Sequence, residues 1–285
     1  MTFSVVIPAY NAEMYIAGAV RSARLAGSED IIVVDDGSTD ETVDAARSTG
    51  AHVVTQRNAG AAAARIRGAE LAAHPLVIFL DADDELIASG VRRSLLLMAN
   101  RPDAVAVGGL VVGLRPDGSR CLLERSPDRD LSFPGLLHAG FGPWPPAAAV
   151  VRGSAFARAL RIDPARLATR YAEDYELVLR LALTGPVLSH QEPSAVYRMH
   201  VGKASSNSVA PLAAKEDIRR YYADHHGVPI SVMGARELRA ASWMRRARYE
   251  HAHRRRAGAI CCAAVAVAAR PVYSLQKVVW SAVSR

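Results

Sequence analysis

The chain opens with a regular alternation of short apolar runs and longer segments of helical periodicity. The apolar runs are compact and rich in Val and Ile, as buried parallel strands are, and they occupy residues 3–8, 31–35, 52–55 and 76–80. Segments with helical spacing lie between them, at residues 14–26, 39–48 and 61–73. Because strands alternate with crossover helices, this region predicts an α/β fold with a mostly parallel sheet flanked by helices.

The rhythm loosens after about residue 100. We expect a strand at 104–112, a turn at 115–118, an apolar segment at 147–152, an amphipathic helix at 173–184 and a late strand or loop at 195–200. From Pro211 onward the pattern is helical and rich in arginine. These changes predict one domain over residues 1–210, divided into halves at about residue 100, and a helical C-terminal extension over residues 211–285.

The net charge is concentrated in this extension. The 285 residues carry a formal net charge of +7, and residues 236–256 hold eight arginines and two glutamates, so six of the excess positive charges lie there. A basic extension on an almost neutral domain favours an anionic surface as its partner. Nucleic acid is not expected as a partner, because the domain itself has acidic strand ends.

The apolar run 257–269, bounded by arginines, leaves two interpretations open. It packs on the domain or on a second subunit as in a homodimer, or it lies on an anionic membrane with its arginines reaching the headgroups. No stretch of about 18 apolar residues and no signal-peptide pattern is present, and the three cysteines lack the spacing of a zinc site. We therefore expect a cytoplasmic protein, or one on the inner face of the cell membrane.

Acidic residues follow two of the predicted strands. Asp35 and Asp36 end the second strand, and Asp81, Asp83 and Asp84 follow the fourth. Ligands of open α/β sheets bind beyond the carboxyl ends of the strands, and Mg²⁺ or Mn²⁺ takes one or two carboxylates together with phosphate oxygens. The alternative is a solvated acidic loop that caps the helix beginning near Leu86. Two acidic strand ends in the same half favour the metal.

Four sequence motifs occur in the following order along the chain: VVIPAYN (residues 5–11), VVDDGSTD (33–40), NAG (58–60) with Arg65, and LDADD (80–84). They resemble glycosyltransferase family 2, which has the GT-A type, Rossmann-like fold. The resemblance is dense over residues 3 to about 90. It makes residues 1–100 the nucleotide-sugar-binding half and 101–210 the acceptor-binding half.

The resemblance implies roles for the residues of these motifs. Tyr10 would stack on the nucleotide base, Asp36 would accept a hydrogen bond from it, and Arg65 would face the base or the diphosphate. Asp81 would reach the ribose or the metal, and Asp83 would be the principal metal ligand. Two further positions of the same motifs, Pro8 and Ala82, are expected to line the nucleotide-sugar site. Ile66 departs from the family, in which Asn often follows the arginine.

The second half matches the family more sparsely. Glu173 and Asp174 resemble its acidic pair at a helix start, whose second acid is the general base, so Asp174 is the catalytic candidate and Glu173 shapes the acceptor site. In the segment Tyr197–His200, His200 would complete the metal shell. Trp144, between prolines, either forms an apolar wall for the acceptor sugar or packs inside a loop.

These residues predict a metal-dependent, inverting glycosyltransferase. It would transfer a single sugar from a nucleotide-diphosphate donor, with UDP-sugars first among them, to a hydroxyl of a glycan, glycolipid or small molecule. The expected cofactor is Mg²⁺ or Mn²⁺. A sugar-1-phosphate nucleotidyltransferase is disfavoured because no Gly-rich basic loop follows the first strand, and a non-catalytic nucleotide-sugar-binding protein is disfavoured because the candidate acids are all present.

Overall fold

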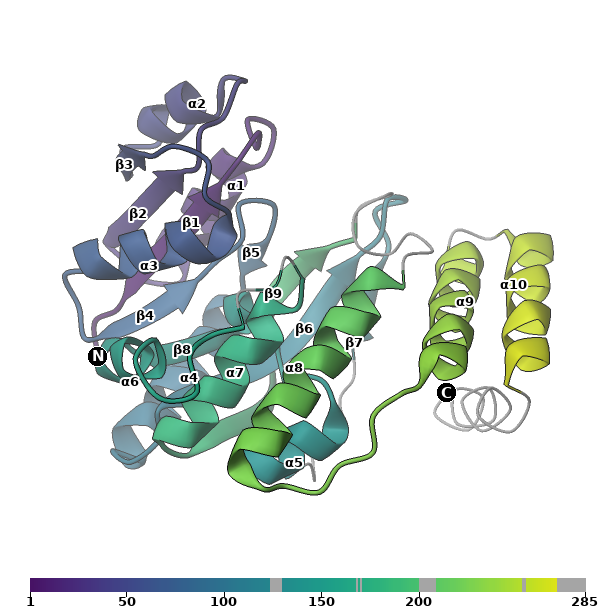
Figure 1. Ribbon diagram of the computed structural model, residues 1–285. Helices are drawn as coiled ribbons and strands as arrows, with labels where there is room; N and C mark the ends of the chain where they lie inside the picture. Colours follow the sequence, from purple (N-terminus) through teal and green to yellow (C-terminus); the bar gives the residue numbers. More distant parts are fainter. Residues whose placement is uncertain (124–129, 168, 170, 200–208, 253–254, 271–285) are drawn as a thin grey trace. The chain divides into compact units, whose positions relative to one another are not determined.

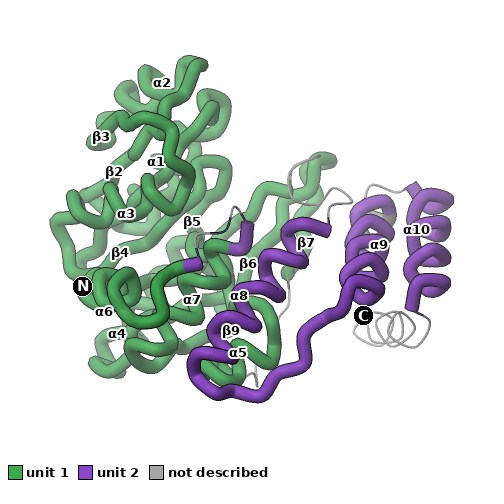
Figure 2. The backbone as a smooth tube through the Cα atoms, viewed as in Figure 1, with its two compact units in different colours: residues 1–166, 173–199 green, residues 167–172, 200–285 purple. Residues whose placement is uncertain are grey.

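A computed structural model describes residues 1–123, 130–167, 169, 171–199, 209–252 and 255–270. The chain forms two compact units, residues 1–166 with 173–199, and residues 167–172 with 200–285 (Figure 2). The division of residues 1–210 into a donor half and an acceptor half stays a prediction.

The first unit is built on one mixed sheet with the strand order β3-β2-β1-β4-β8-β6-β9-β5, to which β7 adds beside β6 (Figure 1). β1 runs parallel to β2 and β4, and β8 runs antiparallel to both β4 and β6. β6 therefore points the same way as β4, and β9 lies parallel to β6. The described strands are β1 (Ser4–Ala9), β2 (Asp30–Asp35), β3 (His52–Thr55), β4 (Leu76–Phe79), β5 (Glu85–Leu86), β6 (Ala106–Leu114), β7 (Arg120–Leu123), β8 (Ala149–Arg152) and β9 (Val187–Arg198).

Helices flank this sheet, and the predicted α/β class is confirmed. The described helices of the first unit are α1 (Ile16–Leu25), α2 (Thr42–Ser48), α3 (Ala61–Leu71), α4 (Ala88–Asn100), α5 (Phe133–Ala139), the short 3₁₀ helix η1 (Pro146–Ala148), α6 (Gly153–Ala159) and α7 (Glu173–Thr184). The strands expected at 52–55 and 76–80 and the helix expected at 173–184 lie where the pattern placed them.

The predicted start of α2 was wrong. The helical spacing predicts a start at residue 39, but α2 begins at Thr42 and its N-cap residue Glu41 makes no side-chain cap. The Ser38 hydroxyl instead accepts a hydrogen bond from the backbone N–H of Asn11 at 2.9 Å, and the backbone N–H of Thr42 donates to Asp40 at 3.1 Å. The polar residues before α2 therefore join two loops rather than cap the helix.

Close packing of α3 on the sheet depends on its small residues. The buried residues of α3 are Ala64, Arg65 and Gly68, so the side facing the sheet carries one long side chain among small ones. A Cβ added at Gly68 would lie 2.2 Å from Cγ1 of Val6 in β1. Because Arg65 precedes Gly68 by one helical turn, it lies on the same face and is carried inward with it.

Gly90 permits an equally close approach of α4 to β9. A Cβ at this position would lie 2.1 Å from the backbone oxygen of Pro193. Because backbone atoms cannot move aside cheaply, Gly90→Ala is expected to lower the free energy of unfolding by about 2 kcal/mol. Gly18→Ala in α1 is the matched control, because its Cβ would meet atoms only at 3.8 Å and beyond and alanine favours helix. Chemical denaturation of both variants measures the difference, and equal stabilities would contradict this packing.

The second unit contains three described helices, α8 (Ala210–His226), α9 (Ala235–Ala252) and α10 (Arg256–Ala269). α9 and α10 pack against one another, and an ion pair of 2.9 Å joins Glu237 near the start of α9 to Arg270 at the end of α10. The predicted helical extension is confirmed. Within the described part of the chain, none of the helices combines the length and the apolar character that crossing a bilayer requires.

Candidate functional site

The loops after β1 and β2 are joined by hydrogen bonds at the carboxyl edge of the sheet. Asn11, with a φ of 48°, accepts a hydrogen bond from the backbone N–H of Thr39 through its side-chain oxygen at 2.9 Å. The backbone N–H of Ala12 donates to the Thr42 hydroxyl at 2.7 Å. Tyr10 lies in this loop with half of its surface exposed (52%), so its ring is available for stacking, whereas Pro8 is buried within β1.

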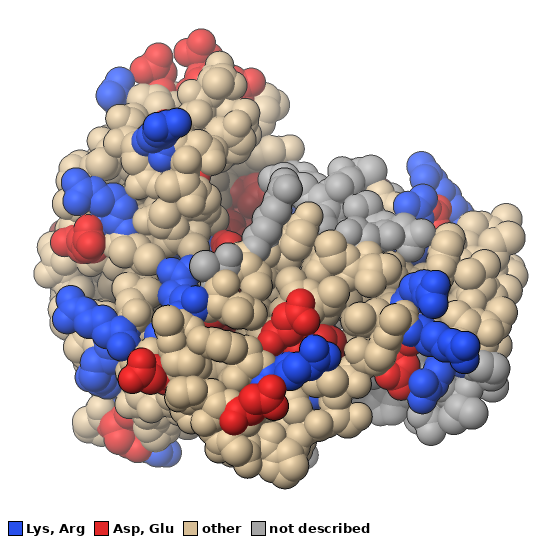
Figure 3. Space-filling model, in the orientation of Figure 1, with Lys and Arg blue, Asp and Glu red and all other residues tan. Residues whose placement is uncertain are grey.

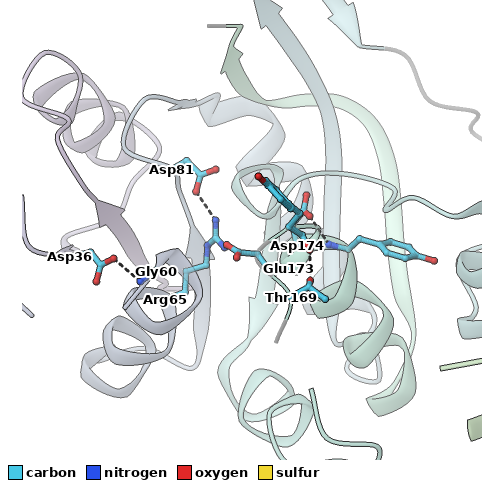
Figure 4. Close-up of polar contacts among 9 residues, drawn as sticks. Asp36, Gly60, Arg65, Asp81, Thr169, Glu173 and Asp174 are labelled. Carbon is cyan, nitrogen blue, oxygen red and sulfur yellow. Dashed lines mark hydrogen bonds and ion pairs between the residues drawn. The ribbon is translucent and has the colours of Figure 1, made fainter. Parts of the chain in front are cut away.

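Asp36 organises the following loop. Its carboxylate is buried and accepts hydrogen bonds of 2.8 Å from the side-chain amide of Gln56 and from the backbone N–H groups of Ala59 and Gly60 (Figure 4). A carboxylate offers about four acceptor positions, so these three donors leave room for about one more. The expected bond to a nucleotide base stays a prediction, and the structure adds a second task, which is to hold the start of α3.

Arg65 extends from α3 between two acids that are far apart in sequence (Figure 4). One terminal nitrogen donates to Asp81 at 2.8 Å and the other donates to Glu173 at 3.1 Å. Burial lowers the pKa of Arg65, but the charge of Asp81 and its hydrogen bond, and then the charges of Glu173 and Asp174, outweigh it and raise the pKa above the usual value. The Nε atom is buried and has no hydrogen-bond partner among the described residues.

The acidic loop after β4 is fixed by the end of β9. β5 pairs with β9, and the backbone N–H of Arg198 donates to the Asp84 carboxylate at 3.0 Å. The Arg198 guanidinium contacts the backbone oxygen of Asp83 and the Glu85 carboxylate. Asp84 is buried, and this burial, followed by the charge of Asp81, raises its pKa to about 8. Asp84 therefore anchors the loop, while Asp81 and Asp83 are partly exposed beside it.

Helix α7 carries the second acidic pair. Glu173 and Asp174 lie in its first turn, where the helix dipole favours negative charge. Asp174 is exposed, and one of its oxygens accepts the backbone N–H of Tyr175 at 2.8 Å. Arg180 anchors this helix. It is buried and donates to the backbone oxygen of Ala159, the last residue of α6, and to those of Ile162 and Pro164, which follow α6. The anchored helix therefore fixes the positions of Glu173 and Asp174.

An open pocket of about 380 Å³ lies beside the contact between Arg65 and Glu173. Its lining comes from α3, α6, α7 and the segment after α6, and it is mostly apolar: Ala62, Arg65, Ile66, Phe156, Ala159, Leu160, Arg166, Glu173, Leu177 and Arg180. The side chain of Arg65 is 9% exposed and that of Glu173 is 29% exposed, so water screens this ion pair less than it screens a pair on the surface. The ion pair is therefore more than an exposed surface contact.

Tyr197 is a site residue that the sequence did not single out. It lies near the end of β9, and burial raises the pKa of its hydroxyl to about 12, followed by the charges of Asp84, Asp83, Asp81 and Asp174. Tyr197 therefore lies within electrostatic range of both acidic groups. The sequence pointed to the segment Tyr197–His200 through His200 and not through Tyr197, because the approach of β9 to the acidic loop depends on the pairing of β5 with β9.

One predicted residue, Trp144, packs inside the fold instead of lining an open site. Trp144 is buried, with its ring against Gly108 and its Nε1 atom donating to the backbone oxygen of Leu188 at 3.3 Å. Its ring face is covered by the sheet, so the packed-loop alternative replaces the expected acceptor wall. Ala82 is buried within the acidic loop. His200 lies outside the described residues.

The described residues contain no group of three or more His, Cys, Asp or Glu side chains arranged to hold a metal ion by themselves. The available donors are the partly exposed Asp81 and Asp83, which are hard oxygen ligands of the kind that Mg²⁺ and Mn²⁺ bind. Mg²⁺ sites of nucleotide enzymes often use one or two carboxylates, with phosphate oxygens and water completing the shell. The donor set therefore fits a cation that arrives with a diphosphate.

Comparison with known proteins agrees with this arrangement. Residues 4–135 match the family model described as glycosyl transferase family 2. The "uncharacterized glycosyltransferase YibD" of Escherichia coli K12 is 38% identical over 107 residues, which cover 35% of this chain and 31% of that protein. The "putative teichuronic acid biosynthesis glycosyltransferase TuaG" of Bacillus subtilis is 36% identical over 114 residues, 37% of this chain and 45% of that protein. The chain thus spans less than half the length of these two relatives.

The fold is shared with a solved structure at low sequence identity. The crystal structure of S. aureus TarS 1-349 superposes with a TM-score of 0.59 at 16% identity, covering 88% of this chain and 73% of that chain. The same protein has been solved in complex with UDP-GlcNAc, with a TM-score of 0.57. This likeness confirms the expected GT-A type fold, and residues 4–135 of the chain are similar to glycosyltransferase family 2.

Proposed function

We propose that this protein is a metal-dependent, inverting glycosyltransferase that moves one sugar from a UDP-sugar to an acceptor hydroxyl, in the synthesis of a cell-surface polysaccharide or another glycoconjugate. The observation that carries the proposal is the contact of Arg65 with both Asp81 and Glu173. It joins the acidic loop beyond the carboxyl end of β4 to the acidic start of α7, so the proposed donor site and the proposed base, Asp174, would adjoin one another. Sugar transfer requires such a meeting, because it needs both reactants aligned.

The donor would lie along the carboxyl ends of β1, β2 and β4. Tyr10 has an exposed ring on which the base would stack. The loop held by Asp36 would border the nucleotide site as well. UDP is the first choice of nucleotide because TarS, which shares the fold, binds UDP-GlcNAc. The Nε–H of Arg65, which lacks a partner among the described residues, is a further donor suited to an anion such as the diphosphate.

Asp83, together with Asp81, would hold Mg²⁺ or Mn²⁺. When bound, the cation would neutralise the charge that develops on the departing nucleotide diphosphate. Asp174 would accept the proton of the acceptor hydroxyl as the bond from the sugar C1 atom to phosphate breaks. Its exposure leaves an oxygen open to an acceptor, since only one of its oxygens is engaged by Tyr175. Glu173, tied to Arg65, positions the start of α7.

A panel of UDP-, GDP- and dTDP-sugars tests the proposal. With Mn²⁺ present, thermal unfolding should shift upward most with the UDP-sugar, and nucleotide release should follow on addition of the acceptor. A ligand that binds only the folded protein raises its free energy of unfolding. At about 100 times the Kd the gain is roughly 2.7 kcal/mol. No shift and no nucleotide release with any member of the panel would overturn the proposed function.

Asp83→Asn separates the metal from the rest of the site. The variant is expected to lose the part of the thermal shift that depends on Mn²⁺, because a neutral amide replaces a charged oxygen ligand. Asp103→Asn is the matched control, since Asp103 precedes β6 and therefore lies at the amino edge of the sheet, exposed and paired with Arg101. The metal assignment fails if both variants keep the full Mn²⁺-dependent shift.

A further inference from the structure

Helix α10 has an unusual composition for a helix that is partly exposed. Residues 257–269 contain no charged side chain and no polar one apart from the two cysteines. One face of the helix is buried through Cys262 and Ala266, and the neighbouring α9 buries a matching row, Ala240, Met244 and Ala247. This packing uses only part of the apolar surface of α10.

The rest of the apolar surface faces outward. Ile260 is 70% exposed and Val265 is 43% exposed. At 100° per residue, these two lie on one arc of the helix with other exposed small residues: Ala257, Cys261, Ala264 and Ala268. A continuous apolar arc on a helix marks a contact surface, because water is an unfavourable neighbour for it. We call this arc the outer face of α10.

Arginines surround the outer face. Arg255 and Arg256 begin the helix, Arg270 ends it, and all three are exposed. Arg256 precedes Ile260 by one turn on the same side. Two more exposed arginines, Arg236 and Arg239, lie at the start of α9. This end of α9 is next to the end of α10, because Glu237 forms an ion pair with Arg270. Figure 3 shows cationic side chains gathered over α9, with the visible face of α10 free of charge.

The charges at both ends of α10 decide between possible occupants. One way for a second copy to cover the outer face is to bring its own α10 alongside. In a parallel pair Arg255 and Arg256 would meet their counterparts, so like charges would oppose association at that end, whereas Arg270 is already paired with Glu237. An anionic surface meets the same arginines with opposite charge. The 14 residues of α10 extend about 21 Å, which is shorter than a bilayer core of about 30 Å.

From this geometry we infer that the outer face of α10 docks on an anionic lipid bilayer, with the helix lying in the plane of the interface. Ile260 and Val265 enter the boundary between headgroups and acyl chains, and Arg239 and Arg256 contact the lipid phosphates. The inference does not depend on the proposed transfer reaction, because it uses only residues of the second unit. It assigns the basic extension a partner other than substrate.

Flotation of the full-length protein with lipid vesicles tests the inference. Vesicles of phosphatidylcholine alone are compared with vesicles of phosphatidylcholine and phosphatidylglycerol in equal parts. We expect binding to the anionic vesicles only, and weaker binding at high salt, because the screening length falls from about 10 Å at 0.1 M to about 3 Å at 1 M. Equal binding to both kinds of vesicle would overturn the inference.

Substitutions on the outer face should weaken binding without unfolding the helix. The pair Ile260→Gln and Val265→Gln is expected to lower the affinity for anionic vesicles at least about tenfold, because both apolar contacts are lost. Leu25→Gln is the matched control, an equally exposed apolar residue (74%) in the first unit. Ile260→Ala keeps an uncharged, helix-favouring residue and is expected to give a smaller loss. Circular dichroism confirms that the helices are retained.

Charge is tested separately. Arg239→Gln with Arg256→Gln should lower the affinity roughly fivefold for each arginine, whereas Arg47→Gln in α2, which is 62% exposed, should have no effect. Light scattering without lipid measures the alternative occupant. A stable dimer that dissociates when Ile260 and Val265 are replaced by Gln would show that a second copy covers the outer face, and would overturn the membrane assignment.

Discussion

Asp174→Asn is expected to reduce sugar transfer by about 10² to 10⁴-fold while leaving donor binding almost unchanged. A positioned general base contributes a factor of this size, and the amide cannot accept the proton of the acceptor hydroxyl. Donor binding should persist because the residues expected to hold the nucleotide, Tyr10 and Asp36, belong to other elements. Single-turnover transfer rates and the thermal shift with a UDP-sugar measure the two quantities independently.

An exposed acid on another element provides the control for Asp174. Glu176 lies in the same turn of α7 but is buried, so its substitution would test packing instead of catalysis. Glu192→Gln is better suited, because Glu192 is exposed on β9 and has no proposed role. It should transfer at the normal rate. If Asp174→Asn also transfers at the normal rate, Asp174 is not the base, although the donor site would remain as proposed.

The first hundred residues were predictable because their signals are local. β1, β2 and β4 are fully buried or nearly so, and such strands appear in a sequence as continuous apolar runs. α1 and α3 fill the gaps between them. The same locality explains why the acids at the ends of β2 and β4 could be identified, since the ends of neighbouring parallel strands share one edge of the sheet.

The second half gave weaker signals. α5 and α6 have seven residues each, as α2 does, but they lie outside the regular alternation of strands and helices that made α2 recognisable. β9 runs over twelve residues and contains Pro193, so only its end was expected as a strand. Trp144 was ambiguous because its partner, Gly108, lies elsewhere in the sequence, and the lack of a side chain there is what lets the indole pack into the core.

The contact of Arg65 with Glu173 could not be predicted from either residue. The two are 108 positions apart, and their meeting depends on α3 packing against β1 and on Arg180 fixing α7. An arginine on an alanine-rich helix ordinarily suggests a solvated face. Gly68, one turn later, is the local feature that could have indicated burial, because it allows the helix to approach the sheet.

Arg65→Leu is expected to lower the free energy of unfolding by about 2 kcal/mol and the unfolding temperature by about 5 °C. The cost arises because Asp81 and Glu173 lose the cation between them. Removing one partner of a fully buried pair costs about 3–5 kcal/mol, but the side chains of Asp81 and Glu173 are 38% and 29% exposed, so water recovers part of the loss. Arg65→Lys should lie between, since an ammonium cannot bridge both acids as a planar guanidinium does.

A double-mutant cycle with Glu173→Gln gives the sharpest test of this bridge. In the wild-type background Glu173→Gln should destabilise the protein, because it removes one ion pair from Arg65. In the Arg65→Leu background the same change should stabilise it, because it removes one of two unpaired carboxylates. The sign of the effect therefore reverses, and the coupling should lie within about 0.5–3 kcal/mol. Destabilisation by Glu173→Gln of the same size in both backgrounds would mean that Arg65 does not link the acidic loop to α7.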